Sequence, residues 1–144
     1  MEYSIDELVK VYGEGSNCPS RDQWKNLLEG DLSQPLTVVN FFKLRKNADT
    51  AIIDDAISGE EAFSKYAEVS VPTVDKVGGH FALRGVVEND FMGDKLLDWD
   101  LIAVGQYPER KNFIELLMDK EYQACVKYRQ AAVEAQHVYF VNAM

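Results

Sequence analysis

Cysteine, histidine and proline are scarce in this sequence, and the scarcity argues against several kinds of site. Its 144 residues include two cysteines, two histidines and four prolines. Cys18 and Cys125 fit no metal or redox spacing, so we expect two free thiols and a cytoplasmic location. The two histidines are His80 and His137, and His80 has no carboxylate at helical spacing. We therefore expect no metal site and no cofactor.

Long apolar runs and an excess of positive charge are also lacking. No run approaches the roughly 20 apolar residues of a membrane-spanning helix, and the first ten residues do not have the pattern of a secretory signal. Fifteen basic and twenty-four acidic residues give a formal net charge of −9. Because nucleic acids and anionic membranes attract basic surfaces, we expect neither as a partner.

The remaining composition is that of one globular domain, with 47% hydrophobic and 27% charged residues. A serine followed three residues later by an acid or an amide begins each of two short helices, expected over 4–12 and 21–29. Thirty residues bury too little surface to fold alone. We therefore expect 1–33 to be a helical extension packed on a core domain of 34–144.

The residues after 33 alternate between strand and helix patterns. Pro72 should kink or break the first of these helices, and the second has a candidate break near Asp119. The predicted elements are a strand over 34–45, a helix over 58–77, a strand over 80–87, a hairpin connection over 88–96, a strand over 97–108, a helix over 109–136 and a strand over 137–144. The order βαββαβ predicts an α+β, ferredoxin-like fold, with a four-stranded antiparallel sheet and helices on one face.

The first and third strands are apolar at both parities. In the first strand, Val38 and Phe42 share one parity and Val39 and Phe41 the other. A sheet with one face in water should alternate between apolar and polar residues. We therefore expect a homodimer in which the sheets of two copies cover each other.

Four polar residues on the predicted strands form the first candidate site. His80 and Arg84 share a parity on one strand, Asn40 lies among apolar residues on another, and Asp100 belongs to a third. In a ligand cavity, Arg84 would hold an anionic or carbonyl group and His80 would transfer a proton as the catalytic base. Alternatively, Arg84 pairs with Asp100 and His80 only bonds a backbone carbonyl.

The second candidate site is on the last helix. Tyr122 and Arg129 lie on one stripe and could hold a carboxylate or phenolate. The alternative is that Arg129 reaches the edge of the stripe and pairs with a local acid. Tyr66 could add a hydroxyl to the cavity and Trp99 an aromatic wall, although both residue types also serve as core packing.

Three segments resemble the dimeric α/β-barrel proteins grouped as domain of unknown function 1330. They are FSKYAEVSVPTVDKVGGHFALRGVV, WDLIAVGQYPERKNFIELLMDKEYQACVKYRQAA and the closing strand. The resemblance covers 36–141 and implies a ferredoxin-like protomer that pairs sheet to sheet, with a cavity between sheet and helices. It implies no particular activity. His80 stands where the family pattern would place Arg or Lys after the two glycines.

These features predict a protein that binds a small aromatic or carboxylate-bearing molecule between sheet and helices. If it is an enzyme, we expect cofactor-independent chemistry of the monooxygenase or isomerase kind, with His80 as base. The alternative is a non-catalytic homodimeric module whose polar core residues form ion pairs. An open cavity faced by His80 and Arg84 would favour binding, and a filled core with an Arg84–Asp100 pair would favour the module.

Overall fold

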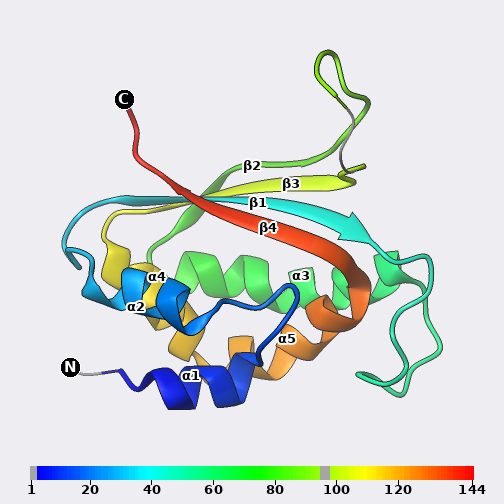
Figure 1. The fold of residues 1–144 in the computed structure, drawn as a ribbon, viewed down its shortest axis with the longest axis horizontal. Coiled ribbons are helices and arrows are strands. Elements are labelled where there is room, and N and C mark those ends of the chain that lie inside the picture. Colours follow the sequence, from blue (N-terminus) through cyan, green and yellow to red (C-terminus); the bar gives the residue numbers. More distant parts are fainter. Residues whose placement is uncertain (1–2, 95–97) are drawn as a thin grey trace.

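The computed structural model describes residues 3–94 and 98–144, which form a sheet with helices against one of its faces (Figure 1). Residues 1–2 of the predicted extension, 95–96 of the predicted hairpin connection and 97 of the predicted third strand lie outside the described residues. The elements are α1 (Ile5–Tyr12), α2 (Arg21–Glu29), β1 (Leu36–Leu44), α3 (Gly59–Lys76), β2 (His80–Val86), β3 (Leu101–Tyr107), α4 (Arg110–Met118), α5 (Lys120–Ala132) and β4 (Val133–Val141).

The sheet has the strand order β2-β3-β1-β4, and every neighbouring pair is antiparallel. The strand order and the helix between β1 and β2 are those of the ferredoxin-like fold, so this part of the prediction is confirmed. Helices α1 and α2 begin at the serines that predicted them, and α3 begins after a serine in the same way. The hydroxyls of Ser4, Ser20 and Ser58 each accept a hydrogen bond from the amide three residues later.

The last predicted helix is divided and ends earlier than expected. It breaks at Asp119, whose carboxylate accepts a hydrogen bond from the amide of Tyr122 and begins α5. Residues 133–136 were expected to be helical, but β4 already begins at Val133. Its backbone is extended, with φ −92° and ψ 132°, and it pairs with Leu44 of β1. Pairing with a distant strand therefore overrides the helical pattern. Pro72 also does not divide α3, which is one helix over 59–76.

The sheet has an inner face toward the helices and an outer face that no helix covers (Figure 1). On β1, Leu36, Val38 and Phe42 are buried and point inward. Their neighbours point the opposite way, so cross-strand pairing gives the membership of the outer face. The apolar side chains of the outer face are Val39, Phe41, Leu83, Ile102, Val104, Tyr139 and Val141.

The N-terminal helices pack on the core. Tyr12 of α1 and Trp24 of α2 belong to the same buried cluster as Leu36 of β1, and their rings lie 5.5 Å apart. The hydroxyl of Tyr12 donates to the carbonyl of Leu117, and Gln130 Nε2 donates to the Tyr12 carbonyl at 2.8 Å. The extension thus covers one end of the helical layer.

Candidate functional site

An extra residue in β2 changes which side chains face the helices. Phe81 pairs with Gly105 and Leu83 pairs with Val104, so Ala82 has no partner of its own on β3. This arrangement is a β-bulge, in which two residues of one strand oppose one residue of its neighbour. The alternation of side chains is therefore reset within β2.

The bulge places Arg84 and His80 on opposite faces of the sheet. Arg84 pairs with Ala103, which also pairs with Asn40, so Arg84 and Asn40 share the inner face. His80 pairs with Gln106 and lies exposed on the outer face. The prediction that His80 and Arg84 share a face is wrong, because counting residues along a sequence cannot detect a bulge.

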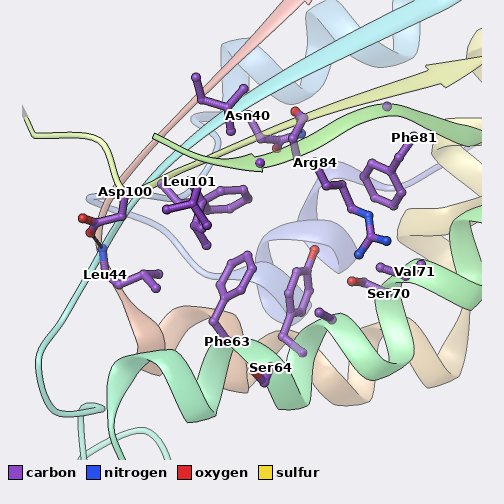
Figure 2. A pocket seen from close by; sticks show the side chains of 18 of the residues that line it. Asn40, Leu44, Phe63, Ser64, Ser70, Val71, Phe81, Arg84, Asp100 and Leu101 are labelled. Atoms are coloured by element: carbon purple, nitrogen blue, oxygen red, sulfur yellow. Dashed lines mark hydrogen bonds between the residues drawn. The ribbon is translucent and has the colours of Figure 1, made fainter. Parts of the chain in front are cut away.

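A cavity of about 990 Å³ lies between the inner face and α3, and we call it the main chamber (Figure 2). Aromatic side chains form part of its wall. The rings of Phe42 and Phe63 are 4.9 Å apart, and those of Phe63 and Tyr66 are 5.6 Å apart. Phe81 and Phe113 extend this wall. A flat, apolar group of a ligand can therefore be held between the sheet and α3.

One end of the main chamber holds an uncompensated positive charge. Figure 2 shows Arg84 pointing from β2 toward α3, and Ser70 of α3 lines the same chamber. The guanidinium carbon of Arg84 lies 5.5 Å from the centre of the Phe81 ring. Among the described residues, Arg84 has no carboxylate partner, and the buried hydroxyl of Ser70 has no hydrogen-bond partner. Both groups are available to a ligand.

The opposite end of the main chamber contains Asp100 and Leu44 (Figure 2). The Asp100 carboxylate accepts a hydrogen bond from the backbone amide of Leu44 at 2.7 Å. It does not pair with Arg84, so the internal ion pair required by the non-catalytic alternative is not formed. The predicted grouping of Asn40, Arg84 and Asp100 around one cavity is observed, without His80.

A pair of tyrosines closes the deep side of the main chamber. The hydroxyls of Tyr66 on α3 and Tyr122 on α5 are 2.8 Å apart. Burial, reinforced by Tyr122, raises the pKa of the Tyr66 phenol well above its ordinary value. Tyr66 is therefore a neutral hydrogen-bonding group. Asn40 lies beside this pair on the chamber wall, and its amide nitrogen donates to the Ala103 carbonyl at 3.2 Å.

A second cavity of about 520 Å³, which we call the side chamber, lies between the N-terminal extension and the core. Tyr122 and Asn40 line it as well as the main chamber. Arg129 also lines it, and its Nη1 atom donates to Gln136 Oε1 at 2.7 Å. Tyr122 and Arg129 thus both face a cavity. In the described chain, Arg129 does not form the predicted alternative pair with a local acid.

Trp99 does not line either chamber, so its predicted role as a cavity wall is wrong. Its ring lies 5.7 Å from Phe41 and 5.2 Å from His137, in an aromatic cluster on the outer face. The sequence analysis missed Ser70 and Phe81 as chamber residues. Ser70 offered a signal, because it is a small polar residue in the apolar stripe of a helix. Phe81 offered none, since the bulge decides its neighbours.

Within 3–94 and 98–144, no three His, Cys, Asp or Glu side chains are grouped so that they could hold a metal ion. Over the same residues, no helix combines the length and the apolar character needed to cross a bilayer.

Comparison with known proteins gives one family and several similar structures. The model of the family described as "Domain of unknown function (DUF1330)" matches residues 51–144. A protein of unknown function from Rhodopseudomonas palustris, RPA0582, is 27% identical with a TM-score of 0.81, over 91% of this chain and 98% of that one. Its methylated form gives 27% identity and a TM-score of 0.82, over 90% and 96%.

A more distant structure has the same fold. It is a dimeric protein of unknown function with a ferredoxin-like fold from Bacteroides fragilis. It is 11% identical with a TM-score of 0.50, over 76% of this chain and 96% of that one. At this identity the likeness concerns the fold alone. No curated protein matches the chain significantly.

Proposed function

The chain belongs to the family of domain of unknown function 1330, and we propose that it binds a small aromatic carboxylate in the main chamber. The observation that carries the proposal is Arg84, an arginine without a carboxylate partner among the described residues, at one end of an aromatic chamber of about 990 Å³. Ligand sites typically measure roughly 300–1,000 Å³ and combine apolar walls with a few polar groups. The main chamber has these properties.

The chamber suggests how such a ligand would lie. Its ring would lie in the chamber against the edge-to-face pair of Phe42 on the sheet and Phe63 on α3. Its carboxylate would accept hydrogen bonds from Arg84, whose planar guanidinium suits a carboxylate, and from the free hydroxyl of Ser70. A ligand hydroxyl could bond to Asn40 or Tyr66.

We propose that the main chamber binds its ligand and that His80 does not transfer a proton there. A general base must reach its substrate within hydrogen-bond distance, and His80 lies on the outer face. Burial raises the pKa of Tyr66, which lines the chamber, well above its ordinary value. A phenol with a raised pKa remains protonated at neutral pH and is a poor base. It is suited to donating a hydrogen bond to the ligand.

A fluorescent probe tests the binding proposal. 6-Hydroxy-2-naphthoate has a flat ring, a carboxylate and a hydroxyl. We expect its fluorescence anisotropy to rise and saturate as the protein is added. We expect 2-naphthoate to displace it better than 2-naphthol does, because only 2-naphthoate has a carboxylate for Arg84. Absence of saturable binding, or equal displacement by the two competitors, would contradict the proposal.

We also propose that two copies associate through the outer face. Leu83 and Tyr139 on this face are 54% and 53% exposed, although both are large and apolar. The connection after β2 rises on the same side of the sheet (Figure 1), and its residues Phe91 and Met92 are 96% and 85% exposed. The Bacteroides fragilis protein of this fold is described as dimeric, which supports a second copy as the cover. Sedimentation velocity at micromolar concentration should find a dimer, and a monomer would refute this arrangement.

A reducing, cytoplasmic location is part of the proposal. Cys18 is half-buried and Cys125 is buried, and both are free thiols. Burial raises the pKa of Cys125, which keeps it in the unreactive thiol form. Cellular fractionation followed by detection of the protein would test the location.

A further inference from the structure

The side chamber is built by the extension and the core together. Tyr12 of α1 and Trp24 of α2 line it from the extension. Tyr122 and Arg129 of α5 and Gln136 of β4 line it from the core. The extension lies outside the residues matched by the family model, 51–144. This chamber therefore depends on a part of the chain that the family assignment does not describe.

Two buried N–H donors on residues that line the side chamber have no hydrogen-bond partner within the described part of the chain. They are the indole Nε1 of Trp24 and the Nε of Arg129. Trp24 is only 2% exposed, so water does not reach its indole N–H from the surface. Buried donors are almost always satisfied in folded proteins, and an exception calls for a specific explanation. A ligand that accepts both hydrogen bonds is such an explanation.

The charge of the side chamber indicates what kind of acceptor it would bind. Among residues 3–94 and 98–144, its lining contains Arg129 but no aspartate or glutamate. The contacts of Arg129 are neutral: Nη1 donates to the Gln136 amide oxygen at 2.7 Å, and the guanidinium carbon lies 5.6 Å from the centre of the Tyr66 ring. A partly buried guanidinium without a counter-charge favours an anion. This is a local cationic site in a protein of net charge −9.

The outer wall of the side chamber is fixed in place by Asn17. Its side chain accepts a hydrogen bond from the Gln136 amide at 3.0 Å and donates one to the Glu134 carbonyl at 3.1 Å. Asn17 itself has a φ of 64°, a left-handed conformation that asparagine tolerates better than most residues. Gln136 is thereby held through its backbone by Asn17 and through its side chain by Arg129. The hydrogen-bond partner of Arg129 is therefore held in place before any ligand binds.

We propose that the side chamber is a second binding site, which takes a small oxyanion such as a carboxylate or a phosphate. The anion accepts hydrogen bonds from Arg129 Nε and Trp24 Nε1, and it neutralises the Arg129 charge. Asn40 and Tyr122 line both chambers, but Arg84, which we assign to the carboxylate of the main-chamber ligand, lines only the main chamber. The anion site does not depend on Arg84.

Nuclear magnetic resonance of the two donors tests the proposal directly. A ¹⁵N–¹H spectrum contains separate signals for the indole N–H groups of Trp24 and Trp99 and for arginine Nε–H groups. Trp24→Phe and Arg129→Lys assign the relevant signals by removing them. The full-length protein is titrated with sodium acetate or with sodium phosphate at constant ionic strength.

We expect the Trp24 and Arg129 signals to move downfield along a saturable curve while the Trp99 signal stays in place. A response to acetate alone identifies the anion as a carboxylate, and a response to phosphate alone identifies it as a phosphate. Responses to both indicate a general oxyanion site, and each of these three results supports the proposal. If neither salt moves the Trp24 signal, or if Trp24 and Trp99 move together without saturation, the proposal is overturned.

Variants separate this site from general charge effects. Trp24→Phe keeps an aromatic ring against Tyr12 but removes the donor, and Arg129→Lys keeps the charge but removes the Nε–H group. Each should weaken anion affinity by about tenfold or more. Anion binding to Trp24→Phe is measured from the remaining Arg129 signal, and anion binding to Arg129→Lys is measured from the Trp24 signal. Arg21→Gln removes one positive charge from an exposed residue and should leave the anion affinity unchanged. An equal loss in Arg21→Gln, or unchanged affinity in both chamber variants, would refute the site.

Discussion

Replacing Arg84 by glutamine removes the charge that we assign to ligand binding and retains most of the side-chain volume. Arg84 contacts the Phe81 ring but has no acidic partner among the described residues, so the substitution breaks no ion pair of the protein. A net hydrogen bond to a charged group contributes about 1.5–3 kcal/mol, whereas solvent-exposed ion pairs contribute about 0.2–1 kcal/mol. Because Arg84 is exposed at its end of the chamber, we expect a loss of about 1–2 kcal/mol. This corresponds to a ~5- to 30-fold higher Kd for 6-hydroxy-2-naphthoate.

Anisotropy titrations of the wild type, Arg84→Gln and Arg21→Gln measure this effect. Arg21 is an exposed residue paired with Asp6 at 2.7 Å, so its substitution reproduces the change in net charge away from the main chamber. We expect Arg21→Gln to bind the probe like the wild type. We also expect 2-naphthol, which has no carboxylate, to compete equally well in all three proteins. If Arg84→Gln and Arg21→Gln have the same affinity for the probe, Arg84 does not bind its carboxylate and the reasoning fails.

Three further predictions concern stability, register and assembly. The pKa of Asp119 is lowered, first by the hydrogen bond from the Tyr122 amide and then by Lys76. The ionised Asp119 carboxylate therefore stabilises the fold above its unfolded pKa of about 3.9, and this stabilisation is lost as the pH falls through the lower folded pKa. Asp119→Ala should therefore lower the free energy of unfolding by about 1 kcal/mol at pH 7 and by less near pH 3 in urea denaturation, and an equal loss at both pH values would contradict this. Deletion of Ala82 removes the bulge residue without altering the pairing on either side. The protein should therefore fold and bind the probe with unchanged affinity. A folded protein that does not bind the probe would contradict the register of β2 against β3. Leu83→Asp places a charge on the outer face and should convert the dimer to a folded monomer in sedimentation velocity, whereas a persistent dimer would exclude this face as the interface.

The parts of the fold that depend on local signals could be predicted from the sequence. Each serine cap lies at the start of a helix, and the two glycines end α3, where Gly78 has a φ of 94°. The apolar character of both faces of β1 also indicated a sheet with a face that the helices leave uncovered. These signals depend on residues close together in the chain, so they do not require knowledge of the tertiary structure.

Other features depend on contacts between distant residues and could not be predicted. Ala82 becomes a bulge only through the register of β2 against β3, and that register decides the face of Arg84. Val133 ends α5 because it pairs with Leu44 of β1. Trp99 precedes β3, and its side chain packs against Phe41 and His137 on the outer face. In each case a long-range contact outweighs the local pattern.

Only part of the candidate site could be predicted, because the rest depends on long-range contacts. Asn40, Tyr66 and Tyr122 follow the periodicity of regular elements, and the structure brings them to the wall of the main chamber. Arg129 likewise follows the stripe of its helix and reaches the side chamber. Trp24 was not identified, because its role depends on how α2 packs against the core.

A crystal structure of the protein with 6-hydroxy-2-naphthoate tests the central claim most directly. We predict electron density for the ring in the main chamber against the Phe42–Phe63 pair, with the carboxylate within hydrogen-bond distance of Arg84. Density for the probe only on the outer face, or a main chamber that excludes the probe at saturating concentration, would contradict the claim that this chamber is the ligand site.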